Sequence, residues 1–199
     1  MANKIAGIIL AAGLSSRMGT PKMLLKWGSS TVLGQVISTF QQVGVDQIVV
    51  ITGAERKLIE AEAMNCSSGF PLECVFNPQF ESGDMLSSLQ CGLNVLGEEI
   101  TSALIGLGDQ PQLSLEAVSS VLEMTEISEG KLIVPSHDGH RGHPLLVHRN
   151  FWKNILTLSP PATLRDFLNQ KKDLIHYVET DQTILKDLDT PQDYSRDRP

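Results

Sequence analysis

Residues 5–22, Ile-Ala-Gly-Ile-Ile-Leu-Ala-Ala-Gly-Leu-Ser-Ser-Arg-Met-Gly-Thr-Pro-Lys, join an apolar run to a loop rich in glycine, hydroxyl groups and cations. The apolar run is typical of a buried β-strand. Glycine lets the loop backbone adopt positive φ and approach a ligand closely. Successive N–H groups in such a loop form an anion-binding concavity, to which Arg17 and Lys22 add full positive charges. The stretch therefore predicts a loop that follows a strand and binds the phosphates of a nucleotide.

The spacing of this loop differs from two well-known phosphate-binding motifs. Gly13 and Gly19 are six residues apart and Lys22 comes three residues later, whereas a P-loop places its lysine directly after the second glycine. The dinucleotide-binding fingerprint Gly-x-Gly-x-x-Gly does not occur here either. An ordinary strand-to-helix turn is the alternative for Gly13 alone. The two cations in the same loop favour phosphate binding.

Strand and helix patterns alternate through the first two-thirds of the chain. The expected strands are Lys4–Leu10, Gln47–Ile51, Leu72–Phe76 and Ala103–Leu107, and the expected helices are Thr31–Val43, Glu55–Met64, Met85–Leu96 and Leu115–Met124. Successive βα units of this kind predict a mostly parallel sheet with helices on both faces. Ligands of such sheets bind beyond the carboxyl ends of the strands, where the loop after Leu10 would lie.

The pattern becomes less regular after Gly130. Short strands are expected at Leu132–Pro135, Leu145–His148, Ile175–Val178 and Ile184–Leu188, and helices at Asn150–Leu156, at Thr163–Gln170 and after Thr190. We expect one domain over residues 1–199, with a nucleotide-binding half (1–130) and an acceptor-binding half (131–199). The predicted fold class is α/β, a Rossmann-like three-layer α/β/α domain with a mostly parallel, mixed sheet.

Composition narrows the class of protein further. The 199 residues are 41% apolar and 20% charged, which is typical of a globular domain. A net charge of −7 argues against nucleic acid as a partner, because the phosphate backbone requires a basic surface. No apolar run reaches the roughly 18 residues of a membrane span, the first residues do not resemble a signal peptide, and the cysteines show no disulfide or zinc spacing. We expect a cytoplasmic protein with no membrane partner.

Two aspartates are candidate metal ligands. Asp109 follows an apolar run and Gly108, which would place its carboxylate at the carboxyl end of a strand. Mg²⁺ bound with a triphosphate uses one or two protein carboxylates. A turn-capping role is the alternative, but a position at the same sheet edge as the phosphate loop favours the metal. Asp189 is the second candidate, because on a strand Asp187 and Asp189 would share one face.

Leu-Ala-Ala-Gly-x-Ser-x-Arg-Met-Gly followed by a lysine resembles the signature of the cytidylyltransferase-type nucleotidyltransferases, whose fold is nucleotide-diphospho-sugar transferase-like. The similarity is greatest to the molybdenum cofactor cytidylyltransferases among the MobA-like NTP transferases. It implies nucleotide contacts at Leu10, Ala11, Ala12, Gly13 and Ser15. It also implies that Arg17 and Lys22 hold the phosphates. The related guanylyltransferases usually read Leu-Ala-Gly-Gly, so Ala12 favours CTP over GTP.

The resemblance also implies roles for residues farther along the chain. Gly-Asp-Gln-Pro, which contains Asp109, matches the family's metal motif, and Asp189 matches the aspartate before Thr-Pro that helps to hold the metal. The positions that match nucleotide contacts are Asn77, Ser87 and Ser88, and variable spacing leaves the choice between the serines open. The positions that match the mouth of the acceptor pocket, where they would contact the acceptor's phosphate, are Arg141 and His143. Residues 158–165 replace the family's Gly-Asp-x-Gly loop, which leaves the acceptor open.

The implied activity is Mg²⁺-dependent transfer of CMP from CTP to a phosphorylated acceptor, molybdopterin, with release of pyrophosphate. Arg17, Lys22 and Asp109 would be the catalytic residues, acting by positioning and by charge stabilisation. One alternative is transfer to a sugar or polyol phosphate. Another is a non-catalytic nucleotide-binding protein that assists the maturation of a molybdoenzyme client.

Overall fold

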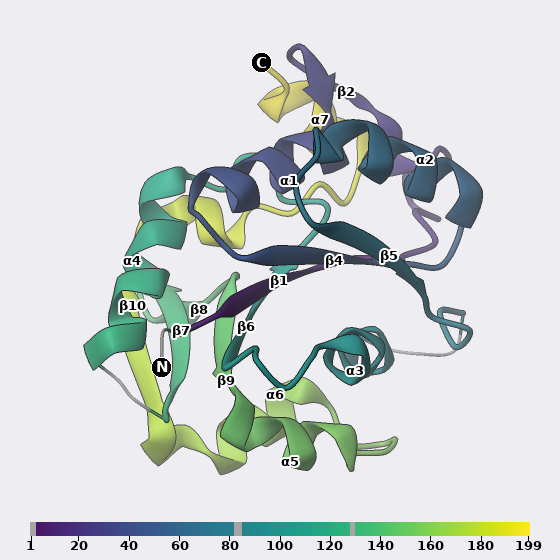
Figure 1. The fold of residues 1–199 in the computed structure, drawn as a ribbon. Helices are drawn as coiled ribbons and strands as arrows, with labels where there is room; N and C mark the ends of the chain where they lie inside the picture. Colours follow the sequence, from purple (N-terminus) through teal and green to yellow (C-terminus); the bar gives the residue numbers. More distant parts are fainter. Residues whose placement is uncertain (1–2, 82–84, 128–129) are drawn as a thin grey trace.

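The chain folds around one twisted sheet covered by helices on both faces (Figure 1). The computed structural model describes residues 3–81, 85–127 and 130–199. The strands of the sheet are β1 (Ile5–Ala11), β4 (Gln47–Thr52), β5 (Leu72–Phe76), β6 (Ser102–Leu107), β7 (Leu132–His137), β8 (His140–Arg141), β9 (Leu145–His148) and β10 (Ile175–Glu179). Their order is β10-β7-β9-β6-β1-β4-β5, with β8 paired to β7.

Pairing within the sheet is mixed and mostly parallel. Strand β1 runs parallel to both β4 and β6, β4 runs parallel to β5, and β7 runs parallel to β10. Strand β9 lies antiparallel between β6 and β7. Strands from both expected halves of the chain thus belong to the same sheet. The predicted α/β fold class is confirmed.

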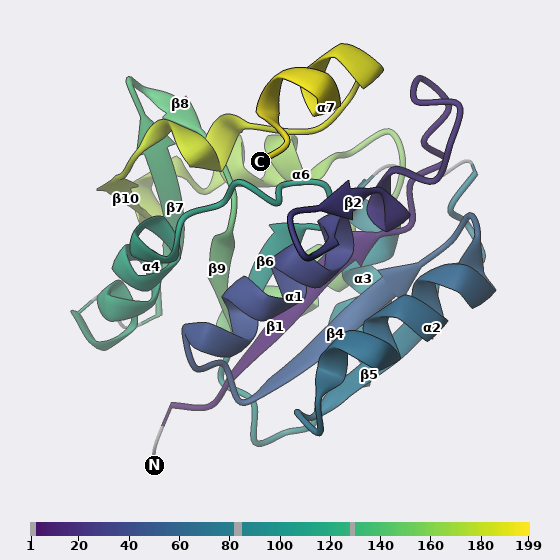
Figure 2. The same cartoon turned by 90° about the horizontal axis from the view of Figure 1, so that it is seen from above.

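The helices form two layers, one on each face of the sheet (Figures 1 and 2). On one face lie α1 (Val32–Gln42), α2 (Arg56–Ser67) and α4 (Leu115–Ile127), and on the other lie α3 (Met85–Val95), α5 (Trp152–Leu156) and α6 (Leu164–Gln170). Phe40 of α1 is fully buried. Its ring lies so close to the strands that a Cβ on Gly7 or Gly106 would be 2.6 Å from it. These two glycines therefore allow α1 to pack closely on the sheet.

Local signals in the sequence match the observed helix ends. Thr31 caps α1, its hydroxyl accepting from the Gly34 N–H at 3.0 Å. Gly44 follows α1 with φ of 82°, the left-handed conformation common after helices. Capping boxes begin α6 at Thr163 and α7 (Pro191–Asp197) at Thr190. Within the described part of the chain, no helix has the length and apolar character needed to cross a bilayer.

The expected strand Ile184–Leu188 was wrong. The chain there forms the short 3₁₀ helix η4 (Gln182–Leu185) and then an extended segment outside the sheet. Its backbone groups pair with other partners: the Ile184 carbonyl accepts from the His143 N–H, and the Leu188 N–H donates to the Asp109 carbonyl. Asp187 and Asp189 consequently do not share the face of a strand.

A small unit outside the main sheet was not foreseen. Strands β2 (Lys26–Trp27) and β3 (Ser30–Thr31) form a hairpin that follows the 3₁₀ helix η1 (Lys22–Leu24). Figure 1 shows this hairpin beside α7 at the top of the molecule. Trp27, Val32 and Leu188 form a separate buried cluster there, and the Tyr194 hydroxyl donates to the Lys26 carbonyl at 2.6 Å. This contact joins the chain segments that carry Lys22 and Asp189.

Candidate active site

The candidate site lies where the sheet changes its winding direction. The connection from β1 leads through α1 to β4 on one side, whereas β6 pairs with β1 on the other side. A crevice therefore opens beyond the carboxyl ends of β1 and β6, the usual ligand position in such sheets. A cavity of about 230 Å³ lies there, lined in part by Ala12, Gly13, Lys22, Ser88 and Asp109. All five belong to segments that the sequence had singled out.

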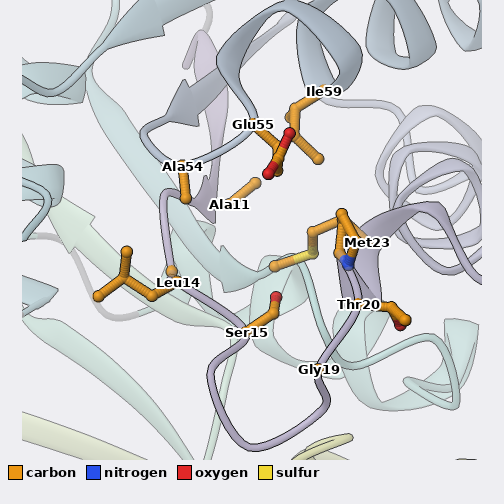
Figure 3. A pocket seen from close by; sticks show the side chains of 11 residues that line it. Ala11, Leu14, Ser15, Gly19, Thr20, Met23, Ala54, Glu55 and Ile59 are labelled. Carbon is orange, nitrogen blue, oxygen red and sulfur yellow. The ribbon is translucent and has the colours of Figure 1, made fainter.

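The loop after β1 has a second cavity on its other side, of about 220 Å³ (Figure 3). The side chains of Ser15 and Met23 point into this space, whereas that of Leu14 points away from it. Ser15 and Gly19 adopt left-handed φ values of 50° and 67°. The Ser15 hydroxyl accepts from the Lys22 N–H at 3.3 Å. The loop thus bends back on itself and brings Lys22 to the crevice.

Charged side chains form a cluster at the crevice. The Lys22 ammonium donates a hydrogen bond to Asp109 and lies 3.5 Å from Asp189 Oδ1. Arg17 Nη2 is 3.1 Å from the same Asp189 oxygen. The Lys22 and Asp109 side chains are only 11% and 15% exposed, whereas that of Arg17 is 68% exposed. Residues expected to hold phosphates thus meet residues expected to hold a metal.

The donors in this cluster fit a magnesium ion that is bound together with a nucleotide. Carboxylate oxygens are ligands that Mg²⁺ prefers, and Mg²⁺ fills its remaining positions with phosphate oxygens and water. Within residues 3–81, 85–127 and 130–199, no group of three or more histidine, cysteine or acidic side chains forms a metal site by itself. Asp109 and Asp189 can therefore hold such an ion only in combination with other ligands. The phosphate oxygens of a bound triphosphate would be such ligands.

Gln110 and Asp187 lie beside this cluster, and the sequence had suggested no role for either of them. Asp187 Oδ1 accepts from Gln110 Nε2 at 2.7 Å. Partial burial of the carboxylate, and then the negative charge of Asp109, raise the pKa of Asp187 to about 6. The sequence features that could have pointed to these two residues are the Asp-x-Asp spacing and the glutamine directly after Asp109. Their contact across 77 residues of sequence was not visible.

The segment expected to contact the nucleotide is organised by one buried side chain. Asn77 is 1% exposed, and its Nδ2 donates to Ser87 Oγ at 2.9 Å and to Ser88 Oγ at 3.0 Å. Its Oδ1 accepts from the Gln79 N–H at 2.9 Å. The amide therefore ties the end of β5 to the first turn of α3. Of the two serines, Ser88 lines the crevice.

The residues expected to contact the acceptor line a third and larger cavity, of about 880 Å³. Residues of the β7–β8 hairpin, of α6 and of the first turn of α3 line this cavity. Met85 lines both this cavity and the crevice. The Arg141 guanidinium donates from Nε to the Tyr177 hydroxyl at 2.9 Å and from Nη1 to Asn169 Oδ1 at 2.8 Å. Burial lowers the pKa of His143 to about 4. This shift favours the neutral imidazole at pH 7, and its Nε2 is buried without a hydrogen-bond partner in the described part of the chain.

Comparison with known families identifies the family of this chain. Residues 7–174 match the model of the MobA-like NTP transferase domain. The chain belongs to this family. The molybdenum cofactor cytidylyltransferase of Escherichia coli (strain K12) is 29% identical over 187 residues, covering 94% of this chain and 92% of the relative. A probable molybdenum cofactor guanylyltransferase of Bacillus cereus (strain AH187) is 31% identical over 162 residues, covering 78% and 74%.

This MobA-like NTP transferase shares its fold with proteins of known structure. The crystal structure of Rv0371c from Mycobacterium tuberculosis H37Rv superposes with a TM-score of 0.83 at 26% identity, covering 98% of this chain and 97% of that protein. The structure of Rv0371c in complex with manganese superposes with a TM-score of 0.79 at 23% identity, covering 98% of both chains. The protein is a nucleotidyltransferase with the nucleotide-diphospho-sugar transferase fold.

Proposed function

We propose that this NTP transferase moves CMP from CTP to a phosphorylated acceptor, molybdopterin, with Mg²⁺ as cofactor and pyrophosphate as second product. The observation that carries the proposal is the meeting of Lys22 with Asp109 and Asp189 at the edge of the phosphate loop. Lys22, a cation for a triphosphate, and Asp109, a carboxylate for a divalent ion, line the same crevice, and Asp189 lies beside Lys22. Nucleotidyl transfer requires this combination.

The chain's own residues act by positioning and by charge stabilisation. An acceptor phosphate oxygen attacks the α-phosphorus of CTP, a new P–O bond forms, and the bond to the β-phosphate oxygen breaks to release pyrophosphate. Arg17 and Lys22 stabilise the negative charge that grows on the leaving group. Asp109 and Asp189 would hold Mg²⁺, which supplies further charge neutralisation when bound. A phosphate monoester is already ionised at neutral pH, so this route needs no general base.

The large cavity supports a phosphorylated acceptor with an apolar body. Leu145, Leu164 and Leu168 line it, and so do Arg165 and Arg141. A flat heterocycle that carries a phosphate suits such walls better than a polyol phosphate, which needs many hydrogen-bond partners. The choice of CTP is supported by Ala12 and by the similarity to the E. coli cytidylyltransferase over 94% of this chain. A cytoplasmic location stays a prediction.

Two measurements test the proposal. Thermal unfolding with CTP, GTP, ATP and UTP in the presence of Mg²⁺ should show the largest stabilisation with CTP, about 2.7 kcal/mol at a hundred times Kd. Pyrophosphate release from CTP should then require molybdopterin and fall at least about 100-fold in Asp109→Ala. Asp173→Ala, at an exposed position of the short helix Lys172–Leu174, is the matched control and should keep full activity.

The outcomes separate the competing functions. An Asp109→Ala protein as active as the parent contradicts the metal assignment. Stabilisation by CTP without any pyrophosphate release favours the non-catalytic accessory protein. Pyrophosphate release with a polyol phosphate but not with molybdopterin would mean that the acceptor is a polyol phosphate, while the reaction is still the transfer of CMP.

A further inference from the structure

Asp189 lies in a segment that has no helix or strand to hold it. It follows η4 and precedes α7, and its side chain is 38% exposed. Ile184 and Leu188 anchor the segment because both are fully buried. The Leu188 N–H also donates to the Asp109 carbonyl at 3.0 Å. The residues between these anchors need a further restraint if Asp189 is to stay beside Asp109.

Gln110 supplies a contact to this part of the segment. Its side chain is 1% exposed, and Nε2 donates both to the Ile184 carbonyl at 3.1 Å and to Asp187 Oδ1 at 2.7 Å. One amide nitrogen therefore spans Ile184 to Asp187. Gln110 directly follows Asp109, so the same turn that carries one carboxylate also holds the segment that carries the other.

The hydrogen bonding of Gln110 is incomplete. Its Oε1 is buried, and no hydrogen-bond partner for it exists in the described part of the chain. A buried polar atom without a partner costs stability, so a buried amide of this kind calls for an explanation. An apolar side chain of similar length would fill the space without that cost. It would not link Ile184 to Asp187.

We propose that Gln110 is a positioning residue that holds residues 184–187 so that Asp189 lies beside Asp109. The amide acts on the segment through one backbone carbonyl, that of Ile184, and one side chain, that of Asp187. This inference rests on the proposed function for its consequence, the pairing of two carboxylates around a divalent ion. The positioning itself is a property of the protein without metal or nucleotide.

Gln110→Met removes the two hydrogen bonds and keeps the length of the side chain. The matched control is Gln41→Met, because Gln41 Nε2 also bridges two backbone carbonyls, those of Cys66 and Ser67, and lies at the far end of α1. Amide hydrogen exchange is measured on the metal-free protein. We expect exchange at Leu188 to be at least about tenfold faster in Gln110→Met than in the parent, and unchanged in Gln41→Met.

Mn²⁺ affinity in the presence of CTP, measured by electron paramagnetic resonance, is the second readout. We expect Kd for Mn²⁺ to rise about tenfold in Gln110→Met, since loss of groups that orient ligands typically weakens metal binding by about 10–100-fold. KM for CTP should change by less than about threefold. Gln110→Asn, which is one methylene shorter, should behave like Gln110→Met and covers the case in which that variant fails to fold.

Equal exchange at Leu188 in the parent and in Gln110→Met or Gln110→Asn overturns the inference, whatever the activity. Asp187→Asn keeps the acceptor oxygen and should keep the protection of Leu188, so a loss of protection there also overturns it. A parent protein that binds no Mn²⁺ with CTP contradicts the proposed function instead. The exchange measurement still decides the role of Gln110 in that case.

Discussion

The Lys22 ammonium lies against the Asp109 carboxylate although 87 residues separate them in the sequence. It is also 3.5 Å from Asp189 Oδ1, so it lies within reach of both proposed metal ligands. Together with Arg17, which pairs with Asp189, it offsets the charges of the two carboxylates as long as nothing else is bound. The proposed roles require Lys22 to turn toward phosphate oxygens when a nucleotide brings a divalent ion into the crevice.

Lys22→Met should therefore change metal binding and catalysis in opposite directions. Without the ammonium, Asp109 loses its cation and Asp189 keeps only Arg17, and opposite charges at about 4 Å interact by about 4 kcal/mol near a protein surface. We expect Mn²⁺ to bind at least about tenfold more tightly in the absence of nucleotide, and transfer to fall at least about 100-fold. Titration calorimetry with Lys26→Met, at an exposed site on β2, as control measures the first effect. Mn²⁺ affinity equal to that of the parent contradicts the balancing role.

Arg17→Ala should affect catalysis far more than stability. The Arg17 side chain is 68% exposed and pairs with Asp189, which is 38% exposed, and exposed ion pairs contribute less than about 1 kcal/mol to folding. Its proposed task, stabilising charge on pyrophosphate, is worth about 100-fold or more in rate. Urea unfolding and steady-state kinetics should be compared with Arg196→Ala, whose side chain is 65% exposed and ion-paired in α7. Similar rates in the two variants would remove Arg17 from the reaction.

Much of this arrangement could be predicted because its parts follow local rules. The apolar run before Ala11 and the run before Gly108 predict two strands, and parallel strands bring their carboxyl ends to one edge. Their observed pairing, Leu10 with Leu107, places the phosphate loop beside Asp109. Once the pairing of these two strands is predicted correctly, the phosphate loop and Asp109 must lie at the same edge of the sheet.

The rest depended on contacts between distant residues. Residues 184–188 resemble a strand because apolar residues are interspersed with Lys186 and Asp187, but the Ile184 carbonyl accepts from the His143 N–H and from the side chain of Gln110, which is 74 residues away. The β2–β3 hairpin has strands of two residues each, too short for a periodic pattern. The burial that lowers the pKa of His143 to about 4 was equally invisible, because the sequence indicated only a contact for the acceptor's phosphate at this position.

Ala12→Gly should relax the choice of base. Ala12 is 7% exposed and lines the crevice, so we expect that removing its methyl group gives a purine more room. One methyl group in an apolar pocket contributes about 1–3 kcal/mol to discrimination. We therefore expect the ratio of kcat/KM for GTP to that for CTP to rise about tenfold, measured with both nucleotides in competition. An unchanged ratio means that other residues choose the base.

His143 should make the free energy of unfolding depend on pH in a defined window. Burial lowers its pKa from 6.5 to about 4 in the folded protein. Between these values the unfolded chain binds a proton that the folded protein does not, so acidification favours unfolding. Above pH 6.5 the imidazole is neutral in both states, so His143 does not lower the free energy of unfolding. As the pH falls from 6.5 toward 4, His143 lowers the free energy of unfolding by up to about 3 kcal/mol.

Asp187 opposes this trend, because its raised pKa of about 6 makes the folded protein bind a proton first as the pH falls. The effect of His143 must therefore be measured as a difference between the parent and His143→Gln, in which the contribution of Asp187 cancels. Urea unfolding from pH 4.5 to 7.5 should show the parent losing stability relative to His143→Gln only below about pH 6.5. His140→Gln, at an exposed position of the same hairpin, is the control. Parallel curves for the parent and His143→Gln would mean that the imidazole is not kept neutral by burial.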